Sequence, residues 1–152
     1  MIHKVYVYKN GAVYDGEWFG NQRHGKGTFT WASGAKYVGH YQFDRRHSEH
    51  GVLTYTDGSK YTGSWRNDMR DGNGVFEFPD KSVYEGEFQD NEMTGYGKLT
   101  WAASGNVYHG SFKNGKKNGK GILRYTQQNY EYDGMWQNDK RHGLGKMTWI
   151  TD

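Results

Sequence analysis

The sequence predicts an all-β fold: an elongated, twisted, single-layer antiparallel sheet of consecutive β-hairpins. Three observations carry this prediction. A Tyr-x-Gly-x-aromatic pattern recurs six times, each copy is followed by a short turn and a Gly-x-Gly pair, and aromatic residues make up 17% of a chain that is only 34% hydrophobic. A fixed period of this length is typical of arrays in which one small unit stacks on copies of itself. The aromatic content argues against disorder.

The first strand of each unit follows from the spacing of three columns. A tyrosine opens the unit, a glycine follows two residues later, and a ring follows two residues after that. Residues at alternate positions share one face of an extended strand, whereas a helix would scatter them. The tyrosines are Tyr14, Tyr37, Tyr61, Tyr84, Tyr108 and Tyr132. The second rings are Trp18, Tyr41, Trp65, Phe88, Phe112 and Trp136.

The second strand of each unit begins at the paired glycines and continues with apolar residues at alternate positions. Glycine inside a strand costs about 1 kcal/mol, and it marks places where another group approaches closely. We expect rings of one strand to lie flat over the bare backbone of the next. Burial of each ring contributes roughly 1.5–3 kcal/mol and offsets that cost.

These columns divide the chain into one repeat array over 1–152. Residues 4–13 match the back half of a unit and are expected to form the first strand, and the repeats occupy 14–36, 37–60, 61–83, 84–107, 108–131 and 132–152. The second repeat has one extra residue, and the stretch from His47 to His50 replaces its usual glycine. We therefore predict a β-bulge there.

Residues 14–18 with 23–29, and 132–136 with 142–145, closely resemble the MORN repeat, the membrane occupation and recognition nexus motif. The resemblance covers nearly the whole chain. It implies an elongated, curved hairpin sheet with no catalytic role of its own. It also implies a place in cytoskeletal, ciliary or membrane-associated assemblies. Lipid binding has been proposed for such repeats.

The first candidate site is an aromatic groove. All ring columns lie on one side of the sheet, and the sequence supplies no second layer to cover them. The rings furthest from the glycines are the expected contacts for a helix or extended peptide of a protein partner. These rings are Trp31, Tyr55, Phe78, Trp101 and Tyr125. The alternative is that the rings cover one another completely.

The second candidate site is a basic edge along the hairpin loops. Its members are Arg23, Arg46, Arg70, Lys117 and Arg141, with Met93 breaking the run. Such an edge could bind acidic phospholipid head groups. The alternative is a solvated edge that keeps the hairpin tips soluble, since acidic residues occupy the same tips. The net charge of +3 gives no reason to expect a nucleic-acid partner.

Metal binding and catalysis are not expected. His47 and His50 are three residues apart, so in a regular strand they point to opposite faces, and only a bulge could bring them together. Cysteine is absent, and no catalytic constellation stands out from the repeat. We expect no enzyme activity, no cofactor and no metal.

The C-terminal strand is the last candidate. An open sheet ends in unpaired strands, and residues 145–150 are apolar, with Met147 and Trp149 on one face. This edge is expected to pair with a second copy in a homodimer, or with a continuation of the array in a larger protein.

Together these features predict a non-catalytic interaction scaffold, cytoplasmic and in a cytoskeletal or ciliary assembly, that binds a partner segment in the aromatic groove. The alternative is a peripheral membrane module that uses the basic edge.

Overall fold

The protein folds into one open, single-layer antiparallel sheet. The computed structural model describes residues 1–151. The strands are β1 (Ile2–Val7), β2 (Val13–Phe19), β3 (Gln22–Thr30), β4 (Lys36–Gln42), β5 (Arg45–Arg46), β6 (Ser48–Thr54), β7 (Lys60–Arg66), β8 (Met69–Glu77), β9 (Val83–Gln89), β10 (Glu92–Thr100), β11 (Val107–Lys113), β12 (Lys116–Tyr125), β13 (Tyr130–Gln137) and β14 (Lys140–Trp149). No helix occurs in the described residues, so none there could span a membrane.

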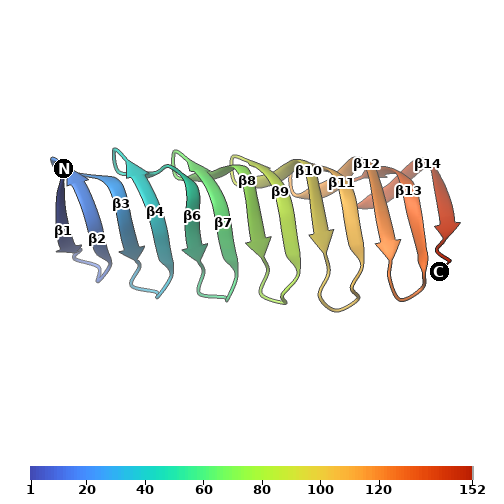
Figure 1. Cartoon of the computed structure of the whole chain (residues 1–152), viewed down its shortest axis with the longest axis horizontal. Helices are drawn as coiled ribbons and strands as arrows, with labels where there is room; N and C mark the ends of the chain where they lie inside the picture. The colour runs from blue at the N-terminus through green and yellow to red at the C-terminus, as the bar shows by residue number, and fades with distance from the viewer. Residues whose placement is uncertain (152) are drawn as a thin grey trace.

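Each strand pairs with the next one in sequence, and only the short β5 lies off this path, against β4. The chain therefore advances in one direction, and the two termini lie at opposite ends of a long ribbon (Figure 1). This is the fold that the sequence predicts. The first strand differs in its limits, because Asn10 and Gly11 turn the chain and Tyr8 bonds across the turn to Ala12. It begins at Ile2 and ends at Val7.

The hairpin turns within repeats are tight. Five of them place two consecutive residues at positive φ, for example Asn67 at 49° and Asp68 at 69°. This conformation matches the twist of the flanking strands, and Asn, Asp and Gly adopt it readily. Because the turns are so short, the second strand starts about three residues before the glycine pair rather than at it.

The two glycines of each pair have different roles. The first adopts positive φ, such as 98° at Gly25 and 101° at Gly72, and the register shifts beside it within the hairpin. A β-bulge of this class places a glycine in the left-handed region. The second repeat lacks this glycine, and there β6 shifts its register against β7 between Ser48 and Gly51. The predicted bulge in this repeat is confirmed.

The second glycine of each pair makes room for a tyrosine ring. A Cβ added to Gly74 would lie 2.5 Å from Cε1 and 2.6 Å from Cζ of Tyr61. The same close approach recurs at Gly27, Gly97 and Gly121. The expectation that rings lie on bare main chain is confirmed for this glycine column, and it explains how one sheet layer buries large side chains.

Candidate functional site

The tyrosines that open the repeats form the closed centre of the sheet. We call their side of the sheet the ring face. Five of the six are completely buried, and Tyr132 is 5% exposed. The hydroxyl of Tyr61 donates to the Ser64 carbonyl at 2.8 Å, and that of Tyr108 donates to the Ser111 carbonyl at 2.9 Å. Burial raises the pKa of Tyr61 and Tyr108 to about 12. These rings are structural and not open to a ligand.

The second ring of each first strand is also covered. Trp18, Trp65 and Trp136 are at most 5% exposed, and each packs edge-on against tyrosine rings, with a centroid distance of 5.2 Å from Trp65 to Tyr61. Their indole N–H groups donate to backbone carbonyls of a neighbouring strand, for example from Trp65 to Gly51 at 3.1 Å. The alternative in which rings cover one another therefore holds for these two columns.

The predicted groove residues behave differently from the inner columns. Trp31, Tyr55, Phe78, Trp101 and Tyr125 are half-buried and pack against the margin of the core. We call them the outer rings. They recur once per repeat on the ring face, at the end of each second strand. Each of them is reached in part by solvent.

The predicted basic residues lie inside strands and not in loops. We call Arg23, Arg46, Arg70, Lys117 and Arg141 the cation row. Arg23 is the cross-strand partner of Trp18, so it faces the rings. The guanidinium of Arg46 lies 4.7 Å from the Trp65 ring centroid, and that of Arg141 lies 4.5 Å from that of Tyr132. Because the turns are two residues long, these cations cover rings instead of forming a separate edge.

A carboxylate from the next repeat holds most of these cations. Asp68 accepts the backbone N–H of Arg46 at 2.8 Å and the side-chain Nε at 3.3 Å. Arg23 with Asp44 and Lys117 with Asp139 repeat this arrangement. We call each such pair a clamp, since it joins successive repeats. The side chains of Arg23, Arg46 and Lys117 are only 12–21% exposed.

The two candidate sites are parts of one surface. The Arg46 guanidinium lies 5.8 Å from the Trp31 ring, and Lys117 Nζ lies 5.2 Å from the Trp101 ring. Arg70 donates to the Tyr55 hydroxyl at 3.3 Å, and Arg141 to that of Tyr125 at 2.6 Å. The ring face therefore alternates outer rings with cations. Both columns could be predicted from the sequence, but their contact could not, because it depends on the bulged register between them.

Two junctions lack the clamp: Arg70 is paired with Asn91 instead of a carboxylate, and the next junction has neither partner. Met93 stands in the cation row and Gly115 stands where other repeats have Asp or Asn. The backbone is unchanged there, since Gly115 N–H still donates to the Met93 carbonyl at 3.0 Å. An open hollow of about 600 Å³ lies at this place. Its lining includes Phe78, Met93, Leu99, Trp101 and Lys117. In the sequence, the interruption of the basic column by Met93 is the feature that indicates this hollow.

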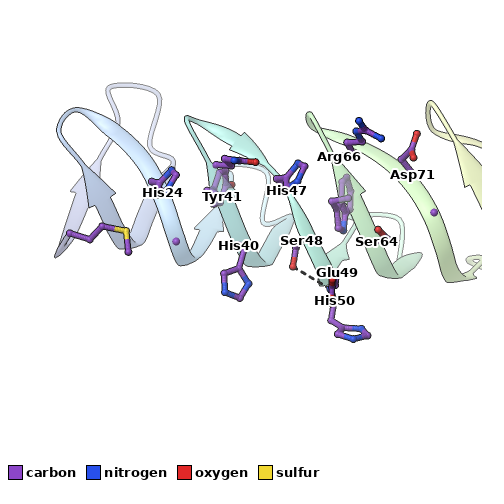
Figure 2. Close-up of a pocket in the computed structure, with 15 residues that line it drawn as sticks. His24, His40, Tyr41, His47, Ser48, Glu49, His50, Ser64, Arg66 and Asp71 are labelled. Carbon is purple, nitrogen blue, oxygen red and sulfur yellow. Dashed lines mark hydrogen bonds between the residues drawn. The ribbon is translucent and has the colours of Figure 1, made fainter.

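A second hollow lies in the irregular second repeat. It measures about 920 Å³, and its lining includes His24, His40, His47, Glu49 and His50. Figure 2 shows His47 near one end of the strands and His50 projecting at the other, so the two imidazoles do not converge. Among residues 1–151, no group of three or more His, Cys, Asp or Glu side chains could hold a metal ion.

The C-terminal strand is the open edge that the sequence predicts. In β14, Met147 is 50% exposed and Trp149 is 73% exposed. The ring of Trp149 packs only at the side of Tyr130, 5.3 Å between centroids. The structure contains a single chain, so pairing of this edge stays a prediction.

Comparison with known proteins gives two positive results. A family model of the MORN repeat matches residues 14–36, 37–60, 61–83, 84–105, 108–130 and 132–151. Among solved structures, the chain is similar to the SAS-4 (dCPAP) TCP domain of Drosophila melanogaster, solved in complex with a proline-rich motif of Ana2 (dSTIL). That likeness has a TM-score of 0.50 at 15% identity and covers 97% of this chain and 71% of the other. No curated protein matches the sequence.

Proposed function

Because this chain belongs to the MORN-repeat family, we propose that it is a non-catalytic scaffold that binds an extended segment of a protein partner across the ring face. MORN repeats are non-enzymatic modules for protein interaction or membrane binding. We favour protein interaction over membrane binding because of the side chains on the ring face.

The observation that carries the proposal is the contrast between the ring columns. The tyrosines and second rings are buried, whereas the outer rings are partly exposed and recur from repeat to repeat. A row of partly exposed rings in a single-layer sheet offers apolar contact area along its whole length. Tryptophan, tyrosine and arginine are the side chains that most often contribute the largest share of the binding energy in protein interfaces. The outer rings Trp31, Tyr55, Phe78, Trp101 and Tyr125 are therefore the proposed contacts.

The solved relative supports the class of partner. Its printed complex contains a proline-rich motif, and extended segments of that kind dock on aromatic surfaces in several unrelated domains. At 15% identity the likeness concerns the fold alone, so no contact residue is transferred from it. The proposed partner segment is an extended peptide, and a partner helix on the same face is the other arrangement that the groove would accept.

The proposed cellular setting is a cytoskeletal or ciliary assembly in the cytoplasm. It rests on what the family resemblance implies and not on any feature of the site. We propose no cofactor and no reaction, because MORN repeats are non-enzymatic modules.

A second proposal is a peripheral membrane module that binds acidic phospholipid head groups through the cation row. Two cations favour it, since Arg70 and Arg141 have no carboxylate within ion-pair distance among residues 1–151. The clamps weigh against it, because Arg23, Arg46 and Lys117 already have carboxylate partners. Head groups would have to displace these carboxylates.

The test is peptide selection on the intact chain. Random peptides displayed on phage are selected on the wild type, and their affinities are compared with those for a variant carrying Trp101→Ala and Tyr125→Ala. A control variant carries Ile122→Ala and Arg124→Ala, on the opposite face of β12. We expect loss of binding in the first variant alone. Equal binding to all three proteins would refute the proposal.

Salt separates the two proposals. Binding to vesicles that contain acidic phospholipid should weaken steeply as ionic strength rises, because exposed charges are screened. Peptide binding that depends on ring burial should persist. If vesicles bind and no peptide does, the membrane proposal replaces the first.

A further inference from the structure

The hollow at Met93 and Gly115 is a specific departure from the repeat. At other junctions the cation lies over a ring of the next repeat, as Arg46 lies over Trp65 at 4.7 Å. At this junction the equivalent ring is Phe112, which lines the hollow. No described cation lies over this ring, and its cross-strand partner Lys117 lies over Trp101 and Trp136 instead. The missing clamp leaves a hollow beside Phe112, whose own ring is only 3% exposed.

At this junction both partners of the clamp differ from those at the clamped junctions. Gly115 has φ of 77°, and the aspartates at the same turn position have φ of 69–70°. The backbone at residue 115 therefore has the conformation of those aspartates, and a Cβ there would lie 3.3 Å from Glu92 Oε2. Glycine stands at this position, and the flexible, apolar Met93 replaces the missing cation. Methionine adapts its shape to irregular partners and is common at binding surfaces.

The charge next to the hollow is incomplete. In the preceding repeat, Arg70 is held by Asn91 rather than by an aspartate, with Nη2 donating to the Asn91 carbonyl at 2.9 Å. Its Nε is buried and has no hydrogen-bond partner among the described residues. Because this nitrogen is buried, it is not itself a contact for a ligand. Arg70 does lack a counter-charge, since no described carboxylate lies within ion-pair distance of it, and a carboxylate is the group that pairs best with a guanidinium.

We propose that the hollow at Met93 and Gly115 is a subsite for an apolar side chain of an extended peptide, and that Arg70 binds a carboxylate of the same peptide. This inference rests on the proposed function and names the chemistry of its partner. Arg70 and Met93 lie two strands apart, in β8 and β10, which is about 10 Å at the usual strand spacing. A peptide extended across the strands covers that distance in about three residues.

The proposal defines a motif: an acidic residue and a large apolar residue three positions apart, in a peptide that runs along the array. The acid is expected toward the N-terminal repeats and the apolar residue toward the C-terminal repeats. Lys117 on the far side of the hollow is paired with Asp139 at 3.6 Å, so a second acid there contributes less.

The test restores the clamp. In the variant Met93→Arg with Gly115→Asp, an arginine covers Phe112 as Arg46 covers Trp65, and the net charge is unchanged. Because it reproduces the pattern of other junctions, this variant should fold, which circular dichroism checks. The control variant Arg23→Met with Asp44→Gly removes a clamp at the far end of the array and leaves the hollow intact.

Peptides selected on the wild-type chain are the probe. We expect them to bind the clamp-restored variant about ten- to hundredfold more weakly, since one buried apolar side chain is lost, and to bind the control variant unchanged. Exchanging the peptide's acid for its amide should lower affinity for the wild type, and should have no further effect on an Arg70→Gln variant.

The outcomes are distinguishable. If the selected peptides lose affinity for Trp101→Ala with Tyr125→Ala but keep it for the clamp-restored variant, the subsite is wrong and the ring face remains the binding surface. If both variants bind as the wild type does, or if no peptide is selected, the subsite and the proposed function are both wrong.

Discussion

A methyl group placed on one glycine should test how a single sheet layer holds its rings. In Gly74→Ala the new Cβ would lie 2.5 Å from Cε1 of Tyr61, a ring with no exposed surface. The ring cannot stay, and overpacking of this kind costs about 1–3 kcal/mol. Displacement also weakens the hydroxyl bond to Ser64, worth about 0.5–1.5 kcal/mol. After a gain of roughly 0.5–1 kcal/mol for alanine over glycine in a strand, we expect a net loss of about 0.5–4 kcal/mol.

The assay is guanidinium unfolding followed by tryptophan fluorescence, with amide hydrogen exchange to localise the loss to β7, β8 and β9. Asn73→Ala, the exposed neighbour on the other face of β8, is the matched control and should change stability by less than about 0.5 kcal/mol. In a Tyr61→Leu background the clashing ring atoms are absent, so Gly74→Ala should no longer destabilise. An equal cost in both backgrounds would refute ring packing on the glycine.

Three further predictions concern the clamps, the tyrosines and the edge. Asp68→Ala should lower stability by about 1–2 kcal/mol, since it removes the acceptor of the Arg46 backbone N–H; a loss that vanishes in high salt would show a purely ionic role. Burial raises the pKa of Tyr14 and Tyr61 from 10.0 to about 12, so unfolding free energy should hold below pH 10 and fall as pH rises toward 12. Stability independent of pH across this window, with tyrosinate absorbance rising, would contradict the burial. Trp149→Lys should abolish any self-association seen by analytical ultracentrifugation, and a strictly monomeric wild type at high concentration would eliminate the homodimer.

The sequence predicted the fold because its signals were local and repeated. Alternation of Tyr14, Gly16 and Trp18 requires a strand, and the glycine of the next strand requires a ring above it. Spacing alone also places the outer rings on this face, since counting by two from the glycines aligns Trp31 and Trp101. Their role as contacts stays a prediction.

The contacts of the cation row could not be predicted in the same way. Placing Arg46 in a loop or over Trp65 depends on whether the hairpin turn has two residues and on where the bulge lies. Positive φ at Gly72 and its equivalents sets this register. The sequence alone does not distinguish a glycine that forms a bulge from one that makes room for a ring. The role of Asp68 as the partner of Arg46, 22 residues away, follows only once that register is known.

The six tryptophans allow one direct test of where a partner binds. Trp18, Trp65 and Trp136 are buried with their indole N–H groups bonded to carbonyls, Trp31 and Trp101 are half-buried outer rings, and Trp149 lies on the edge strand. The indole region of a ¹H–¹⁵N correlation spectrum, recorded while a selected peptide is added, reports on all three sets. Shifts of the Trp31 or Trp101 signals with the buried three unchanged are the expected result. A shift confined to Trp149 would contradict binding on the ring face.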